Sequence, residues 1–382
     1  MRTSSALGVQ RVLESSESGR AFLQEHGVRF DDAPGHSNYF AALQSERRRN
    51  VLRDVHGAIL TAANLTLHDR LAEIPELAAY DCFATDGHWH KAATHDARHD
   101  GRKMAAGHFY SLNLRTHTLR HLAAGEGLHE HDMSALKRVT PRRLRQDVAK
   151  GRRVLLIHDK AGIDFDFWQR CRKESAVYFL SRVKENMVYE WTSSGLWDRA
   201  DARNRGVTDD RRVTTGEGHL LRIVCYTDPV SGEHFEFLTN VMELPPGVIV
   251  ELYRRRWEAE KVFDEIKNKL GEKKAWATSL EAKETQALLI AITHNLLVRY
   301  EAQLERQHGV LNAAEDRRRA KRAEKLGQAC EKKGTPLSTL VLQARRATQR
   351  SVKFVRWLRQ SLRDHAAEAA AVLRLKALYA TL

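Results

Sequence analysis

The sequence is poor in cysteine and proline and has no long hydrophobic run. Among its 382 residues are 4 cysteines, far apart and without any Cys-x-x-Cys pair, and only 7 prolines. Such cysteine usage is typical of a reducing compartment and excludes a disulfide scaffold or a zinc site built from several cysteines. The longest apolar run, Ala287–Val298, is shorter than the roughly 20 residues of a membrane helix, and the N-terminus has no stretch that fits a signal peptide. These absences exclude membrane and secreted proteins and predict a cytoplasmic one.

Positive charge is abundant and unevenly distributed. The net charge is +14, and residues 301–382 alone carry 18 Lys and Arg against 8 Asp and Glu. Two basic runs lie there, at 316–325 and 344–363, and the second interleaves Phe354 and Trp357 with arginines. This density predicts a polyanionic partner such as DNA, whose phosphate contacts weaken as salt rises. The alternative is a solvated basic helix whose apolar residues only pack.

Hydrophobic periodicity predicts helical ends around a strand-rich middle, and therefore a mixed α/β fold. The length predicts two or three structural units. Residues 198–217 are polar and charged, which predicts loops or hairpin tips. Helical spacing occurs at 40–64, 248–270 and 281–304, and strand-like runs occur at 80–85, 107–115, 152–158, 176–183, 187–191, 219–227 and 234–241.

The densest cluster of charged residues lies in the predicted helix at 251–270. Tyr253, Arg256, Glu260 and Lys267 are spaced so that one helical face presents all four. Taken alone, these charges are also explained by ion pairs along an exposed amphipathic helix.

Two aspartates follow apolar strand-like runs. Asp86 comes after YDCFAT and precedes Gly87, a turn signal, and Asp159 comes after RVLLIH. Carboxylates at strand ends, joined by a glutamate on a helix, can hold two hard divalent cations. Mg²⁺ prefers oxygen ligands, and paired ions lie about 3.5–4 Å apart at centres of phosphoryl transfer.

The spacing Tyr, two residues, Arg, three residues, Glu, six residues, Lys resembles the mark of the insertion-sequence-four family of bacterial DDE transposases. The segments FLTNV and ALLIAITHNLL also look like the catalytic block of this family, and the resemblance covers about residues 80–300. It implies an α/β fold with an RNase H-like catalytic core at 79–300 and a β-rich insertion at about 175–245. A helical N-terminal region at 1–78 and a basic helical C-terminal region at 301–382 would flank this core.

The resemblance also implies a reaction. Asp86, Asp159 and Glu260 would be the catalytic triad that binds two Mg²⁺ or Mn²⁺ ions, and Tyr253, Arg256 and Lys267 would contact the DNA backbone near the cut. The expected reaction is metal-dependent cleavage at transposon ends and strand transfer into target DNA, as in cut-and-paste transposition. The expected partners are double-stranded DNA, namely the terminal inverted repeats and the target, and a second copy of the chain on that DNA. The expected location is the bacterial cytoplasm at the nucleoid, and residues 1–78 would recognise the ends or join the dimer.

Rival residues exist at each acidic position. Asp81 competes with Asp86, although strand alternation would turn the two to opposite faces. Asp164 and Asp166 compete with Asp159 and could instead begin a helix. Glu258 and Asp264 are the alternatives to Glu260, and all of these residues could be surface carboxylates beside basic neighbours.

Other features leave further alternatives open. Trp191 and Trp197 could stack on a flipped base, but a single tryptophan more often packs. The cluster His88, His90, His95 and His99 lacks the spacing of a familiar zinc site, and imidazole suits softer metals than Mg²⁺. Two other functions compete with a transposase: a stand-alone RNase H-like nuclease, and a catalytically inactive DNA-binding relic.

Overall fold

The computed structural model describes residues 41–308, apart from short segments at 100, 104–105, 126–131, 161–162, 230 and 268–273, and a few residues between 321 and 332. Its strands are β1 Tyr80–His90, β2 Arg98–His99, β3 Arg102–Lys103, β4 Ala106–Asn113, β5 Leu119–Ala124, β6 Arg153–Ile157, β7 Val177–Arg182, β8 Tyr189–Ser194, β9 Val207–Thr215, β10 Leu220–Thr227 and β11 His234–Thr239. Its helices are α4 Glu46–Thr66, η1 Pro75–Ala79, α5 Asp132–Lys137, α6 Pro141–Leu144, α7 Phe165–Ser175, η3 Ala202–Asn204, α8 Pro246–Arg255, α9 Trp257–Glu265 and α10 Leu280–His308.

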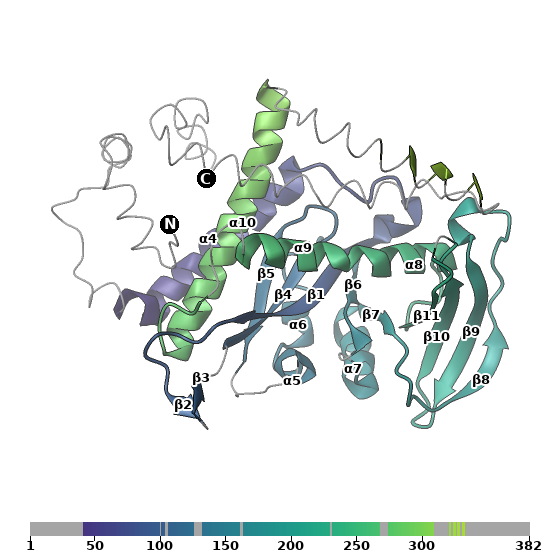
Figure 1. The fold of residues 1–382 in the computed structure, drawn as a ribbon, viewed down its shortest axis with the longest axis horizontal. Coiled ribbons are helices and arrows are strands. Elements are labelled where there is room, and N and C mark those ends of the chain that lie inside the picture. The colour runs from purple at the N-terminus through teal and green to yellow at the C-terminus, as the bar shows by residue number, and fades with distance from the viewer. Residues whose placement is uncertain are drawn as a thin grey trace.

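A single large sheet organises the fold, with strand order β5-β4-β1-β6-β7-β11-β10-β9-β8. β6 pairs in parallel with β1 on one side and with β7 on the other, and the remaining neighbours are antiparallel. The mixed α/β architecture expected from the sequence is therefore present. Figure 1 shows β8–β11 extending the sheet away from the parallel strands.

Helices cover both faces of the parallel strands. Successive residues of β6 serve opposite faces, since Leu155 packs with α8, α9 and α10 whereas Leu156 packs with α5 and α7. Burial on both faces explains why β6 is an unbroken apolar run, as strands of parallel sheets usually are. In Figure 1, α8 and α9 lie along one side of the sheet, and α5, α6 and α7 lie along the other.

α4 and α10 pack against each other beside β5. Ser45 caps α4 by accepting a hydrogen bond from the backbone N–H of Arg48, and Ile59 of α4 contacts Leu288 and Ile292 of α10. α10 begins at Leu280 and continues to His308, across the boundary predicted at residue 300. Within the described residues, no helix has the length and hydropathy that a membrane span requires.

The prediction of loops at 198–217 was wrong for its second half, which forms the nine-residue strand β9, whereas 198–206 is irregular apart from η3. β9 can be polar because its charged side chains form ion pairs, either with the neighbouring strand or within β9 itself. Asp210 accepts two hydrogen bonds, of 2.8 and 2.7 Å, from the guanidinium of Arg222 on β10, and both side chains are buried. Asp209 similarly accepts from Arg211 at 2.6 Å. A charged strand of this kind shows no hydrophobic alternation, so the sequence pattern missed it.

The helix predicted at 248–270 is divided at Arg256. α8 ends at Arg255 and α9 begins at Trp257. Between them the backbone tightens, since Arg256 N–H donates to Tyr253 O at 3.1 Å and Ala259 N–H donates to Arg256 O at 3.0 Å. This turn sets the direction of the Arg256 side chain.

Candidate active site

The three acidic residues predicted as a triad come from three neighbouring elements. Asp86 lies in β1, Asp159 comes two residues after the end of β6, and Glu260 lies in the first turn of α9. β1 and β6 are parallel and pair from Tyr80 to Ala84 and from Arg153 to Ile157, so both aspartates come just after the paired segment, at the same edge. α9 contacts β1 and brings Glu260 to that edge.

The predicted turn at Asp86-Gly87 was wrong, because β1 continues through both residues to His90. Gly87 pairs with Phe109 of β4, and Asp86 pairs with Tyr110. β1 loses its parallel neighbour after Ala84 while keeping its antiparallel one, so the position of Asp86 at the open edge does not require the strand to end there.

Arg256 joins two of the three carboxylates. Its Nη2 lies 2.9 Å from Oε1 of Glu260, and its Nη1 lies 3.5 Å from Oδ2 of Asp86. Burial opposes the positive charge of the guanidinium, but Tyr253, Asp86, Glu260 and Asp159 together raise the pKa of Arg256. Arg256 therefore stays charged and neutralises part of a locally acidic centre.

The carboxylates surround Arg256 without meeting at one point. Within the part of the chain that the structure describes, the groups of three donors with all ligand atoms within 4.8 Å of one another lie elsewhere. The side chains of Asp86 and Glu260 are 24% and 34% exposed, and Asp159 is exposed, so all three are open to a cation from solvent. A set of three carboxylates is the oxygen chemistry that Mg²⁺ and Mn²⁺ prefer.

A cavity of about 620 Å³ lies next to this acidic centre. Both Asp159 and Arg256 line it, and its walls combine cationic with aromatic side chains. The lining includes Lys160, Arg182, Tyr226, Phe235, Phe237, Tyr253, Arg254, Trp257 and Lys261. Trp257 is 56% exposed, whereas burial raises the pKa of Tyr253 to about 12, so its hydroxyl keeps its proton. Acidic side chains also line the cavity, namely Asp159, Asp228, Glu233, Glu251 and Glu258, and Arg254 is paired with Asp228 at 2.5 Å, so the walls are of mixed charge.

Most residues that line the cavity were not predicted from the sequence. Arg182 and Phe235 lie on β7 and β11, where their guanidinium and ring are 5.1 Å apart. Nothing in their sequence spacing connects them with Arg256, because β11 returns to pair with β7 only in the folded sheet. Arg254 and Trp257 could have been proposed from the sequence, because they lie within two residues of the predicted Arg256.

Lys267 lies farther along the helix, beside buried histidines of β1. Its charge, after burial, is among the causes that lower the pKa of His88 to about 3 and of His90 to about 4. Both rings are buried and neutral, and their nitrogens have no hydrogen-bond partner among the described residues. His88 packs edge-on against His90, and His90 packs against His108, whereas His95 is exposed and the side chain of His99 lies outside the described residues.

Acid should destabilise the protein through this histidine cluster. Burial lowers the pKa of His88, His90 and His121 to about 3, 4 and 3, below the 6.5 of the unfolded chain, and that of His108 well below it. The unfolded state therefore binds more protons below pH 6.5, and stability present above that pH is lost as pH falls toward 4. Each imidazole contributes up to about 1.4 kcal/mol per pH unit. Urea unfolding from pH 7.5 to 5 measures this slope. His88→Leu should reduce the slope and His95→Leu should not, whereas a flat profile in the wild type would contradict the account.

Two rival acids are held in other contacts. Asp81 is buried and paired with Arg152 at 2.9 Å and with Arg115 at 3.3 Å, on the opposite side of β1 from the centre. Glu258 is buried and lies 2.5 Å from Nε2 of His117. Both carboxylates are therefore engaged in buried polar contacts inside the fold.

The rivals of Asp159 stand at the start of α7. Asp164 caps this helix by accepting from the backbone N–H of Phe167 at 2.8 Å. Asp166 lies in its first turn, 3.1 Å from Nε2 of His219. Asp264, the other alternative to Glu260, is exposed on α9.

The fold and the site define an α/β protein in which carboxylates of β1 and α9 contact an arginine at the edge of the parallel strands, beside a cavity lined by charged and aromatic side chains. The chain belongs to the transposase DDE domain family, which it matches over residues 73–296. No curated protein matches the chain. One similar solved structure is a piggyBac transposase synaptic complex with hairpin DNA, studied by cryo-EM, with a TM-score of 0.34 and 11% identity. The likeness covers 78% of this chain and 54% of that one, so this chain spans about half the length of the piggyBac chain.

Proposed function

We propose that the protein is the cut-and-paste transposase of an insertion sequence of the insertion-sequence-four family. It would cleave DNA at the transposon ends and transfer the strand ends into target DNA. The observation that carries this proposal is the contact of Arg256 with both Asp86 and Glu260. Residues 170 or more positions apart thereby meet at the helix that holds the family-like Tyr253, Arg256, Glu260 and Lys267 spacing.

An RNase H-like core at about 79–300 is part of the proposal. It is supported by the order β5-β4-β1-β6-β7, in which three antiparallel strands are followed by two strands parallel to β1. The antiparallel strands β8–β11 lie between Asp159 and Glu260 in the chain and support the β-rich insertion proposed at about 175–245. Residues 1–78 and 301–382 would flank this core, and most of them lie outside the described residues.

Asp86, Asp159 and Glu260 would hold two Mg²⁺ or Mn²⁺ ions, and their oxygen donors fit this role. When bound, such ions supply an activated water or hydroxyl nucleophile and stabilise the leaving oxygen. The protein's own contribution is positional. Arg256 orients Asp86 and Glu260, and its planar guanidinium suits a phosphate bidentately once metal ions compensate the carboxylates.

DNA would approach along the cavity beside the centre. Tyr253 and Arg256 line it, and Lys160, Arg182 and Lys261 add positive charge that attracts phosphates, whereas Arg254 is paired with Asp228 at 2.5 Å. Lys267 would contact the DNA backbone just beyond the end of α9. A homodimer on paired transposon ends, working at the bacterial nucleoid in the cytoplasm, completes the proposal.

Removing cavity cations should weaken DNA binding without abolishing it. In the double variant Arg182→Ala/Lys261→Ala, affinity at fixed salt should fall. The slope of log affinity against log salt should decrease by about 0.9 for each phosphate that the variant no longer neutralises. Fluorescence anisotropy with a duplex across several salt concentrations measures both quantities. Lys173→Ala is the matched control, because Lys173 is exposed on α7, on the other face of the sheet. Equal effects of the two variants would place the DNA elsewhere.

Strand transfer separates the transposase from its two alternatives. The wild-type protein is mixed with Mg²⁺, a supercoiled plasmid and a labelled duplex that carries the element's own end with a free 3′ hydroxyl. Joined product is the expected result. Cutting of any duplex without joining would indicate the stand-alone nuclease. Binding without cutting or joining, with either Mg²⁺ or Mn²⁺, would indicate the inactive relic.

A further inference from the structure

The hairpin of β10 and β11 brings a cysteine, a histidine and a glutamate together on one face. In the antiparallel register, Cys225 lies opposite Glu236 and Thr227 lies opposite His234. Because side chains two apart in a strand share a face, all four point the same way. The residues come together only through the fold, since His234 follows Cys225 by nine positions in the sequence.

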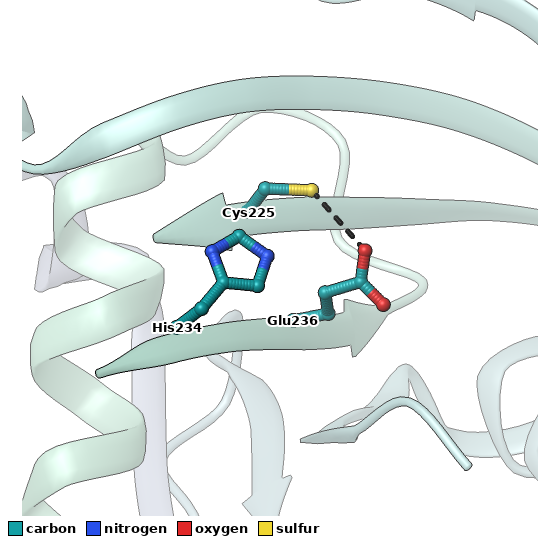
Figure 2. Close-up of side chains that lie close together, drawn as sticks. All are labelled: Cys225, His234 and Glu236. Carbon is teal, nitrogen blue, oxygen red and sulfur yellow. Dashed lines mark hydrogen bonds between the residues drawn. The ribbon is translucent and has the colours of Figure 1, made fainter. Parts of the chain in front are cut away.

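The donor atoms are close enough to share one ion. The thiol sulfur of Cys225, a ring nitrogen of His234 and a carboxylate oxygen of Glu236 all lie within 4.8 Å of one another. Figure 2 shows the imidazole and the carboxylate, both from β11, facing the sulfur of β10. Ligands of a tetrahedral zinc ion bind it at about 2.0–2.3 Å. Small side-chain rotations of exposed His234 and half-buried Glu236 would close the remaining gap.

We propose that Cys225, His234 and Glu236 bind a zinc ion, at a site separate from the acidic centre around Arg256. Sulfur and imidazole nitrogen favour zinc, whereas Mg²⁺ and Mn²⁺ prefer an all-oxygen set. The Cys225 site would therefore select zinc, and the acidic centre around Arg256 would select Mg²⁺ or Mn²⁺. Three protein ligands leave a fourth position for water.

The neighbouring residues support the three ligands. Oγ1 of Thr227 lies 3.3 Å from Nδ1 of His234, which leaves Nε2 of that ring for the metal. Nη1 of Arg211 lies 3.8 Å from Oε1 of Glu236 and leaves Oε2 of that carboxylate for the ion. Arg211 is itself held by Asp209 at 2.6 Å, so its charge is already compensated.

Zinc binding must displace a proton from sulfur. Without metal, the thiol of Cys225 donates to Oε1 of Glu236 at 3.6 Å, and burial raises its pKa to about 12. On binding, the S–H bond breaks, a Zn–S bond forms and one proton leaves to solvent, with no change in oxidation state.

The site would stiffen the wall of the cavity beside the catalytic centre. Tyr226, Phe235 and Phe237 alternate with the three ligands along β10 and β11, and they line that cavity from the opposite face of the hairpin. An ion that fastens the two strands would therefore fix these aromatic rings in place. The binding site itself does not depend on the proposed transposition reaction.

Cobalt(II) titration tests the proposal on the full-length protein. Metal-free wild type should develop the near-ultraviolet absorption band of thiolate bound to Co²⁺, with one equivalent bound, and Zn²⁺ should abolish the band. Cys225→Ser should lose it, and His234→Ala should weaken Co²⁺ binding by at least roughly 10-fold. Cys171→Ser is the matched control, because Cys171 is also a buried free cysteine but lies on α7.

Two results would overturn this site. One is the absence of a thiolate band in the wild type at pH 8 with excess Co²⁺. The other is a band that survives Cys225→Ser or disappears equally in Cys171→Ser. Circular dichroism of each variant shows whether it is folded, and His234→Ala keeps the test valid should Cys225→Ser fail to fold, because the side chain of His234 is exposed. Mg²⁺ added in place of Zn²⁺ should leave the band unchanged.

Discussion

Glu260→Gln should reduce DNA cleavage by at least roughly 100- to 1,000-fold, the loss expected when one preorganised charge at a reaction centre is removed. Glutamine keeps the shape of the side chain but removes the charge that Arg256 contacts at 2.9 Å. DNA binding should be retained or slightly tighter, because one negative charge leaves a surface that phosphates approach. Single-turnover cleavage and fluorescence anisotropy on the same duplex separate the two effects.

Asp264→Asn is the matched control for that experiment. Asp264 is an exposed acid on the same helix, and its loss changes the net charge by the same amount. Cleavage should remain near the wild-type rate in this variant. Activity that survives in Glu260→Gln, or that is lost equally in both variants, would mean that Glu260 is not the helix-borne acid of the centre.

The largest effect on folding is expected at Asp210. Its carboxylate accepts two hydrogen bonds from Arg222, and the side chains are 3% and 5% exposed. Asp210→Ala would leave a buried guanidinium without its counter-charge, which typically costs about 3–5 kcal/mol in the free energy of unfolding. Arg222 also donates to the backbone oxygen of Leu244 at 2.6 Å, so the loss should loosen the connection to α8 as well.

The neighbouring pair supplies the comparison. Asp209 contacts Arg211 in the same strand, but these side chains are 36% and 33% exposed, so Asp209→Ala should cost only about 0–1 kcal/mol. Urea unfolding of both variants measures the difference directly. Equal losses would show that burial of the Asp210–Arg222 pair does not set its contribution.

Strands that face two apolar layers were predictable, and strands whose polar residues pair with each other were not. In the run RVLLI the four apolar side chains are buried on the two faces of the sheet, and the run forms β6. β9 carries Asp209, Asp210, Arg211 and Arg212 in succession. Its stability depends on Arg222, which a sequence pattern within 198–217 does not contain.

The candidate site was predictable where it depends on local spacing. Arg256 and Glu260 are one helical turn apart, and the structure joins them by an ion pair. The contact of Arg256 with Asp86 depends on how α9 crosses β1, which the local spacing does not contain. The metal-binding roles of Asp86, Asp159 and Glu260 remain predictions.

Contacts that depend on strand pairing could not be predicted from the sequence. Arg182 and Phe235 share a cavity wall only because β11 returns to β7. Cys225 and Glu236 meet only through the register of β10 and β11. The sparse cysteines exclude zinc sites built from several thiols, but a site with one cysteine leaves no such spacing signal.

The central claim is that carboxylates at the edge of β1 and β6 support metal-dependent DNA cleavage. The most direct measurement is cleavage of a labelled duplex that carries the element's own end, with Mg²⁺ and with EDTA. Wild type is compared with Asp159→Asn and with Asp166→Asn, its nearby exposed rival. The account predicts Mg²⁺-dependent cleavage at the element boundary that is lost in Asp159→Asn and retained in Asp166→Asn. Cleavage in EDTA, or an active Asp159→Asn beside an inactive Asp166→Asn, would contradict it.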